Sequence, residues 1–539
     1  MKKNFQKIWA IVLVFSFLHL SCARPVAAFT VGEEREVGEI LLYQIRLAFS
    51  LVDDPDISQY VNELGAEVLR VAGAQYFDYH FFVIRNKEFN AFAAPSGLIF
   101  FHSGLIETMG SEDELISVMA HEVGHVVSRH IASRMDKGMK VGIGALALAI
   151  AGLALGGGGV AGQALVTGSM AANQALNLHF SRQDEEEADL LSYGWMKKLE
   201  RDPVAMEKML KTMRRITRYR MGDVPPYLLT HPDPEARLGY VQSLIAIEKA
   251  PLSNVSQQTD NFSFLRFKYR ILSQIEDDGQ FRNFLATKIS DPKSSPLERT
   301  MAKYGLSQVE REANNYERSR ALLLEVIAAY PDRSILLVDL GRVELAAGNK
   351  EKALELTLQA SRKNPADLWA VFQLAKVYLE LGKLKEAEEN LFTVAREIPE
   401  YSKVYYEIGK LRASQGKKGE ASYYLGKHYL YEGRIELAKE NFERVIKDQS
   451  MSRDIRDNAK VQLETIERLE EGPGSKKEQE EEKKRKEEEE GEVGGWCHFE
   501  SDGGMFMLQG SDRSETHCFP WDRQWGNGQL PGSSVQVCG

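Results

Sequence analysis

The sequence predicts a mostly helical α+β fold, in which a domain with a small sheet is followed by a helical solenoid. Two β-rich runs, 79–84 and 98–101, lie among helical hydrophobic patterns in the first half of the chain. In the second half, prolines and small residues recur every 34 residues, a period typical of stacked helix pairs.

Length and composition limit the possible classes of protein. The 539 residues allow three or four domains at about 150 residues each. Lys and Arg total 68 and Asp and Glu total 78, and the net charge of −10 argues against nucleic-acid binding. Residues 23–496 contain no cysteine, so we expect the main fold to use neither a disulfide nor a thiolate metal ligand.

The first 28 residues have the pattern of an export signal. A basic start precedes an apolar run at 8–20, which is too short for a stable membrane span, and small residues favour cleavage before Phe29. Two alternatives stay open: a lipoprotein cut before Cys22, although His19 stands where Leu is usual, and an uncleaved anchor. In a bacterium with two membranes, this signal predicts a periplasmic protein.

Helical patterns at 32–49 and 57–71 precede the first β-rich run, and we expect Pro95-Ser96-Gly97 to join the two runs. The apolar stretch 141–155 is followed by four glycines and is too short to span a bilayer. We expect a buried or loosely packed helix there, with peripheral membrane contact through 141–160 as the alternative.

The repeats begin after a helical connector. Three prolines, three glycines and three alanines keep the 34-residue step: Pro331, Pro365, Pro399, Gly348, Gly382, Gly416, Ala353, Ala387 and Ala421. One helix pair cannot bury its apolar face alone, so neighbouring pairs stack, and such solenoids bind peptides or proteins. The pattern resembles tetratricopeptide repeats. A plain helical spacer is the alternative.

These patterns divide the chain into six segments. They are a signal (1–28), an α+β domain (29–250), a helical connector (251–295), the repeats (296–450), a charged helical or disordered linker (451–493) and a Cys/Trp/Gly-rich tail of unknown fold (494–539). The linker carries oppositely charged residues at i,i+4 spacing, typical of a solvated segment. The tail is either a small disulfide-bonded appendage or a sequence with no selected fold.

A metal-binding pattern lies in an apolar helical stretch at 115–127. His121 and His125 are spaced i,i+4, so both imidazoles project from one helix face and can reach one metal ion. Glu122 lies beside them, where it can accept a proton from water. A catalytic zinc site needs a third protein ligand.

Clustered carboxylates 64 residues later offer that ligand. Glu185 and Asp189 are spaced i,i+4 on a second helical pattern, so one of them could bind the metal while the other orients a ligand imidazole. Taken alone, the segment also fits an acidic helix start, where carboxylates interact favourably with the helix dipole.

The two-His helix, followed by Ser181, Arg182, Glu185, Ala188 and Asp189, resembles the gluzincin metallopeptidases related to CAAX prenyl proteases and the bacterial heat-shock membrane protease. The resemblance implies a zincin-type domain over roughly 30–245 that holds one Zn²⁺ per chain. It also implies that Glu185 is the third zinc ligand and that Asp189 is its supporting partner.

Two further segments resemble this family. Asn90, Ala91 and Phe92 look like its active-site edge strand, along which a substrate would add, with Ser96 where Gly is usual. His231-Pro232 with a later Arg resembles the family's His-Pro…Arg element, which follows the metal ligands along the chain.

The downstream element implies two roles. In a periplasmic branch of the family that carries such repeats, the His of this element can occupy the open coordination position of the zinc and keep the enzyme inactive. This implies that His231 is a self-inhibitory ligand; an ordinary loop His is the alternative. We also expect Arg237 to help stabilise the oxyanion.

Together these features predict a zinc endopeptidase with Glu122 as general base. Unfolded or misassembled envelope and outer-membrane proteins are the expected clients, and the repeats are expected to dock them or an outer-membrane assembly machine. The alternative is a chaperone or adaptor of outer-membrane protein assembly with latent cleavage. An inactive relic is a weaker third possibility, because every expected ligand is present.

Overall fold

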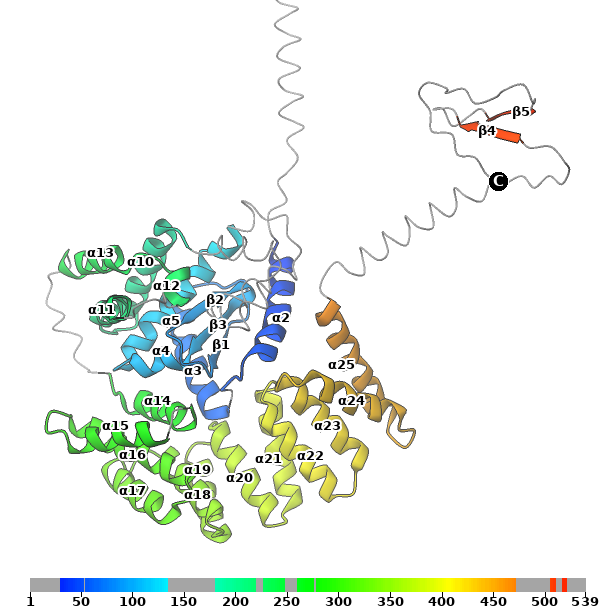
Figure 1. Ribbon diagram of the computed structural model, residues 1–539. Coiled ribbons are helices and arrows are strands. Elements are labelled where there is room, and N and C mark those ends of the chain that lie inside the picture. The colour runs from blue at the N-terminus through cyan, green and yellow to red at the C-terminus, as the bar shows by residue number, and fades with distance from the viewer. Residues whose placement is uncertain are drawn as a thin grey trace, which may run out of the picture. The chain divides into compact units, whose positions relative to one another are not determined.

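The computed structural model describes residues 30–52, 54–133, 180–219, 226–247, 259–275, 278–471, 505–509 and 516–520 (Figure 1). The chain divides into two compact units, Met1–Gly474 and Ser475–Gly539. The expected signal, the stretch 141–160 and most of the linker and tail lie outside the described residues. Within the described ranges, every helix is too short or too polar to cross a lipid bilayer.

Two capped helices open the first unit. Thr30 forms a capping box at the start of α2 (Val31–Ala48). Asp54 precedes α3 (Pro55–Ala72), and its carboxylate accepts a hydrogen bond of 3.0 Å from the Ile57 N–H. Both helices begin where their side-chain caps satisfy the first free N–H groups.

A three-stranded sheet follows, with strand order β1-β3-β2. Its strands are β1 (His80–Ile84), β2 (Ala91–Ala94) and β3 (Leu98–His102), and β3 is parallel to β1 and antiparallel to β2. The turn at Pro95–Gly97 therefore joins β2 to β3. The expectation that it joins the two longer β-rich runs is wrong, because parallel strands need a longer connection, which here includes β2.

Ser96 in this turn has a φ of 69°, in the left-handed region that glycine adopts without Cβ strain. This conformation explains why the resemblance places glycine at the position. A Cβ atom built on Gly38 of α2 would lie 2.5 Å from the Ser96 Cβ. Glycine at position 38 therefore allows α2 to approach the turn.

Helix α5 lies at the centre of the first domain. The helices of this region are α4 (Ser103–Thr108), α5 (Glu112–Val127), α10 (Arg182–Lys198), α11 (Val204–Tyr219), α12 (Pro226–Thr230) and α13 (Pro234–Ile247). All of α5 except its last residue is buried. A Cβ on Gly124 would lie 3.2 Å from the Ala188 Cα, so glycine allows α10 to pack closely on α5.

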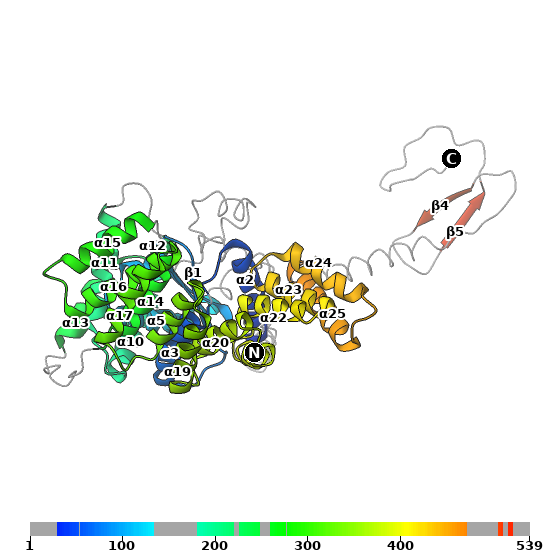
Figure 2. The ribbon, with the colours of Figure 1, turned by 90° about the horizontal axis from the view of Figure 1, so that it is seen from below.

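The helices of the connector and repeats follow one another in chain order (Figures 1 and 2). They are α14 (Phe262–Ile275), α15 (Asp278–Ser290), α16 (Pro296–Glu312), α17 (Tyr316–Ala329), α18 (Ile335–Ala346), α19 (Lys350–Lys363), α20 (Leu368–Glu380), α21 (Leu384–Glu397), α22 (Ser402–Ser414), α23 (Lys418–Tyr431), α24 (Ile435–Lys447) and α25 (Arg453–Glu471). Gly348, Gly382 and Gly416 have φ of 84°, 71° and 76°, as expected where glycine ends a helix.

Helix α25 begins inside the segment expected to be a charged linker. It packs against α24, and its Ala459 and Ile466 are fully buried. The packed helices therefore extend to Glu471.

The first domain and the early repeats share one hydrophobic core. A single buried cluster includes Leu115 of α5 and Leu340 of α18. Arg266 of α14 also joins the two parts, since it lies 2.7 Å from Asp56 of α3 and 2.9 Å from Asp339 of α18. The connector thus lies between the two parts and pairs with both.

The described part of the second unit is an antiparallel pair of strands, β4 (Met505–Gln509) and β5 (Thr516–Pro520). Both lie in the tail, whose fold could not be predicted from the sequence.

Candidate metal centre

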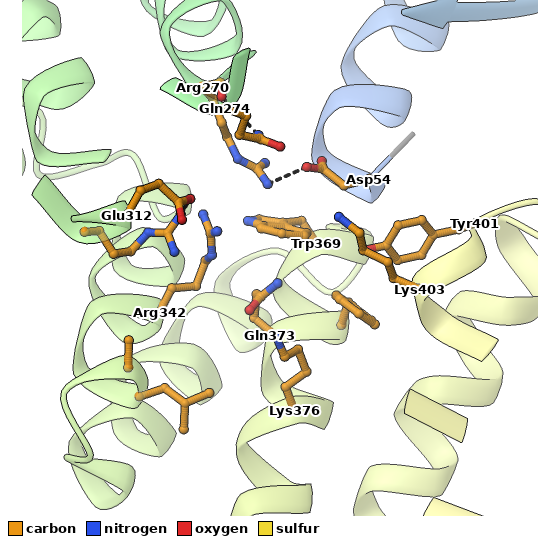
Figure 3. Close-up of a pocket in the computed structure, with 14 residues that line it drawn as sticks. Asp54, Arg270, Gln274, Glu312, Arg342, Trp369, Gln373, Lys376, Tyr401 and Lys403 are labelled. Carbon is orange, nitrogen blue, oxygen red and sulfur yellow. Dashed lines mark hydrogen bonds and ion pairs between the residues drawn. The ribbon is translucent and has the colours of Figure 1, made fainter. Parts of the chain in front are cut away.

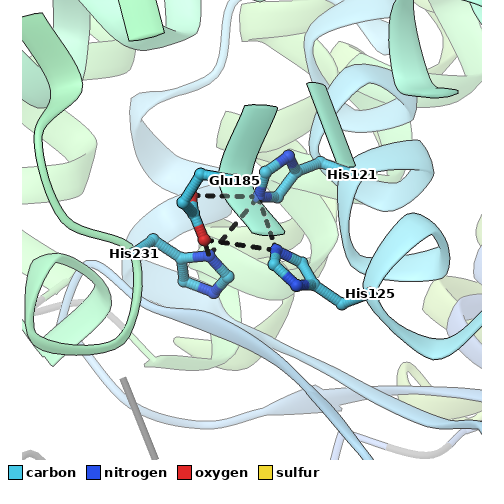
Figure 4. Close-up of side chains that lie close together, drawn as sticks. All are labelled: His121, His125, Glu185 and His231. Atoms are coloured by element: carbon cyan, nitrogen blue, oxygen red, sulfur yellow. Dashed lines mark hydrogen bonds and ion pairs between the residues drawn. The ribbon is translucent and has the colours of Figure 1, made fainter. Parts of the chain in front are cut away.

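Four side chains of metal-ligand type meet inside the first domain (Figure 4). His121 and His125 lie one turn apart on α5, Glu185 comes from the start of α10, and His231 follows α12. None of these side chains is more than 3% exposed. Three segments far apart in the sequence therefore bring them to one buried place.

The distances between these side chains are short. One ligand atom from each residue lies within 4.8 Å of the others. Nε2 of His121 is 3.1 Å from Nε2 of His125, and Oε1 of Glu185 is 3.3 Å from the latter. Nδ1 of His231 lies 3.0 Å from the same Glu185 oxygen and 3.3 Å from Nε2 of His121. Imidazole nitrogens and a carboxylate are zinc ligands, so the donor set fits this metal.

Glu122 adds to this fit. Its side chain is fully buried, and neither carboxylate oxygen has a hydrogen-bond partner among the described residues. Oε1 lies 3.5 Å from Nε2 of His231. A buried carboxylate without a partner is unfavourable, so this arrangement suits a site that receives a cation and a polar reactant.

Asp189 and Arg237 support the ligands from behind. Oδ1 of Asp189 lies 2.9 Å from Nδ1 of His121, which leaves Nε2 of that ring facing the other ligands. The Arg237 guanidinium donates to both Asp189 oxygens at 2.9 and 2.7 Å, and its Nη1 lies 2.7 Å from Oε2 of Glu185. Both carboxylates therefore engage this guanidinium, and the expected oxyanion contact of Arg237 stays a prediction.

The pKa values follow from burial and charge. Burial and Arg237 act to lower the pKa of His121, but Asp189 and Glu185 raise it to about 9. Burial holds the pKa of His125 well below its usual range. For Glu185 and Asp189, burial raises the pKa, but His231, Arg237 and His121 outweigh it and lower both values. The two carboxylates are therefore held in their ionised, acceptor form.

Three contacts of these imidazoles escaped the sequence analysis. Nδ1 of His130 lies 3.0 Å from Nδ1 of His125. The Phe180 ring stacks on His125 with centroids 3.7 Å apart, and the Tyr227 ring stacks on His231 at 4.3 Å. The sequence pointed to one of these contacts only, through a third histidine five residues after His125. Aromatic residues outside a motif cannot be told from ordinary core residues in the sequence.

The expected substrate strand is an outer strand of the sheet. Asn90 immediately precedes β2, and its backbone carbonyl accepts a hydrogen bond of 3.0 Å from the His102 N–H. Ala91 and Phe92 belong to β2, which pairs with β3 and packs against α5. All three residues are buried, and Asn90 Oδ1 has no hydrogen-bond partner among the described residues.

Residues 55–245, which include all four candidate ligands, match the model described as peptidase family M48. Residues 304–367 match a tetratricopeptide repeat. The sequence-based prediction of a gluzincin-like domain followed by these repeats is therefore confirmed.

Two curated relatives match parts of this chain. The beta-barrel assembly-enhancing protease of Escherichia coli K12 is 32% identical over 311 residues, which cover 57% of this chain and 61% of that protein. The matched region thus spans about three fifths of that relative. A mitochondrial metalloendopeptidase of Schizosaccharomyces pombe is 29% identical over 202 residues, covering 38% of this chain and 56% of the relative. Both relatives are peptidases by name, and both matches are partial.

Proposed function

We propose that this chain is a zinc-dependent endopeptidase that hydrolyses peptide bonds in misassembled envelope or outer-membrane proteins. The observation that carries the proposal is the buried set of His121, His125 and Glu185 beside Glu122, a buried carboxylate without a hydrogen-bond partner among the described residues. The M48 match supports the activity, and the name of the E. coli relative supports the class of client.

In this proposal His121, His125 and Glu185 hold one zinc ion. When bound, zinc supplies a Lewis acid that polarises the peptide carbonyl and lowers the pKa of the attacking water. Glu122 accepts a proton from that water and returns it to the leaving amine. Asp189 fixes the orientation of the His121 ring.

Arg237 has a positioning role in the same proposal. Its guanidinium holds Asp189 and Glu185 at the same time, and both carboxylates must keep their places for the ligand set to remain intact. The expected oxyanion contact of Arg237 stays a further prediction, since a guanidinium has five N–H donors.

His231 is proposed as a self-inhibitory ligand. Nδ1 of its ring lies among the ligand atoms, where a substrate carbonyl or the reacting water would need space. Stacking on Tyr227 favours this ring position. Cleavage then requires the segment after α12 to move.

An extended substrate is proposed to add along β2. Strand addition binds mainly through backbone hydrogen bonds and reads little side-chain identity, which suits a quality-control protease.

Three further expectations from the sequence also belong to the proposal. They are periplasmic export by the 1–28 signal, the domain boundaries given above with the packed helices extended to Glu471, and repeats that dock clients or an assembly machine. The tetratricopeptide match supports a protein-binding role for the repeats.

Glu122→Gln tests the proposed chemistry. The variant should retain one zinc per chain by metal analysis, because its ligands are untouched, and should lose cleavage of casein. Cleavage by the purified variant at the wild-type rate would remove Glu122 from this role.

A second candidate function, an adaptor with latent cleavage, is favoured by the full burial of Glu122 and His231. His231→Ala separates the two candidates. Strongly increased casein cleavage is expected for a protease held closed by this ring, whereas an unchanged low rate favours the adaptor.

A further inference from the structure

The two candidate histidine ligands of α5 are held by different groups on the side that faces away from the other ligands. Nδ1 of His121 lies 2.9 Å from the Asp189 carboxylate. Nδ1 of His125 instead lies 3.0 Å from Nδ1 of a third histidine, His130. His130 is only 6% exposed, so this contact is made inside the protein.

The end of α5 brings His130 beside His125. On a continuous α-helix, two side chains five residues apart would point about 140° away from each other. Helix α5 ends at Val127, and Arg129 has a φ of 52°, in the left-handed region. This conformation turns the chain out of the helical path. The rings of His125 and His130 then meet edge to face, with centroids 5.0 Å apart.

In a pair of neutral rings, one arrangement of protons fits this contact. Nε2 of His125 faces Oε1 of Glu185 and Nε2 of His121, so it offers its lone pair to a metal in the proposed site (Figure 4). A neutral imidazole carries its one ring N–H on the other nitrogen. Nδ1–H of His125 therefore donates to Nδ1 of His130, and the N–H of His130 is on its Nε2.

A carboxylate on α10 accepts from that second N–H. Oε2 of Glu187 lies 3.5 Å from Nε2 of His130, and Oε1 of Glu187 accepts a hydrogen bond of 2.9 Å from the Ser128 hydroxyl. Glu187 follows Glu185 by two residues, so the third candidate ligand and this carboxylate come from one helix. The Glu187 side chain is 55% exposed. The contacts therefore run from a buried ligand to the surface.

We propose that His130 is a positioning residue for the metal centre, an inference that rests on the proposed zinc site. His130 accepts the Nδ1–H of His125 and keeps Nε2 of that ring directed at the zinc, and Glu187 orients His130 in turn. Stacking of Phe180 on His125 fixes the plane of the ring. It does not distinguish a ring nitrogen from a ring carbon, whereas an acceptor at hydrogen-bond distance does.

Two substitutions of His130 in the full chain test this role. His130→Leu removes the acceptor, whereas His130→Asn keeps one, because its Oδ1 can take the place of Nδ1. We expect the zinc dissociation constant, measured by competition with a coloured chelator, to rise about 10–100-fold for His130→Leu. For His130→Asn it should rise by no more than a few-fold.

Glu187→Ala tests the outer part of the contacts, and Glu186→Ala is its matched control. Both substitutions remove one negative charge from an exposed position of α10, so their long-range effects on a bound cation are alike. Glu187→Ala should weaken zinc binding a few-fold, because His130 loses its orienting carboxylate, and Glu186→Ala should leave it unchanged. Equal effects of the two substitutions would remove Glu187 from the proposal.

A role in packing alone would give a different result. In the proposal, Co²⁺ bound to His130→Leu has an altered visible absorption spectrum, and Co²⁺ bound to His130→Asn has the wild-type spectrum. If metal-free His130→Leu melts at a lower temperature than wild type, this spectrum decides, and a wild-type spectrum would overturn the proposal.

Two further zinc results would overturn it. They are an unchanged constant in His130→Leu, and equal weakening in His130→Leu and His130→Asn, since the acceptor then has no part. A wild-type chain that takes up no zinc would contradict the proposed function and this inference with it, whereas the other results concern His130 alone.

Discussion

Arg237 at the metal centre is buried and Arg342 of α18 is 15% exposed (Figure 3), and the charges of these two arginines are balanced differently. Arg237 faces two carboxylates, Asp189 and Glu185, both at 2.7 Å. Among the described residues, Arg342 has one carboxylate partner, Asp339, at 3.7 Å, and its pKa is lowered, whereas the pKa of Arg237 is raised well above its usual range. Burial opposes the charge in both places. Asp189 and Glu185 outweigh it at Arg237, whereas Arg311 and Arg270 add to the lowering at Arg342.

This difference distinguishes two kinds of guanidinium. A matched guanidinium holds other side chains in place, and its removal leaves unpaired carboxylates. A guanidinium without a close carboxylate, such as that of Arg342, has N–H donors that lack a hydrogen-bond partner among the described residues. The following experiments test that distinction.

The largest expected effect is a contrast between two equivalent substitutions. Arg237→Met should lower the free energy of unfolding by about 3–5 kcal/mol, because two buried carboxylates lose their partner. Arg342→Met should leave it unchanged or higher, since Asp339 keeps Arg266 at 2.9 Å. Urea unfolding of the metal-free protein measures both. An equal loss of unfolding free energy in both variants would mean that carboxylates stabilise the two arginines to the same degree.

Close packing of α5 and α10 is the next feature to break. Gly124→Ala should lower the free energy of unfolding by about 1–3 kcal/mol and weaken zinc binding, because the new Cβ lies 3.2 Å from Ala188 and α10 carries Glu185. Gly194→Ala on α10 is the matched control. Its Cβ meets nothing within 4 Å, so a gain of up to about 1 kcal/mol is expected from helix propensity. Zinc titration and thermal unfolding follow both variants.

His102 responds to burial differently from Arg237, because burial favours its neutral form. Burial lowers the pKa of His102 to about 3, from 6.5. Below pH 6.5 the unfolded chain binds a proton that the folded chain excludes, so stability falls by about 1.4 kcal/mol per pH unit as the pH approaches 3.

His102→Phe should remove that part of the acid sensitivity. His80→Phe, at an exposed position of β1, should leave it in place. Urea midpoints measured between pH 7 and 4 compare the two, and identical slopes for wild type and His102→Phe would contradict the assignment.

The smallest effect is expected at the turn before β3. Ser96→Gly should raise the free energy of unfolding by less than about 1 kcal/mol, because relief of the positive φ is partly offset by the freedom that glycine adds to the unfolded chain. Ser96→Ala retains the Cβ and should give no such gain. A larger gain for alanine would show that the hydroxyl, not the φ angle, is unfavourable.

The sequence was most informative where spacing along one helix or one repeat carries the information. The i,i+4 spacing of His121 and His125 depends only on helix geometry, and the 34-residue step predicts stacked pairs before any contact is known. It was less informative across segments. The parallel pairing of β1 with β3 was missed because strand pairing is non-local. His130 was missed because it lies beyond the end of α5, where helical spacing no longer relates it to His125.

The sequence by itself determined the ligand-type residues, the order of the two domain types and the helical period, because these are local properties of the chain. Only the tertiary structure decided which charges are matched. Arg270 pairs with Asp54 across a sequence separation of 216 residues, and Arg237 pairs with Asp189 across 48. Such pairs depend on how the helices pack, because packing decides which carboxylates come within reach of a guanidinium.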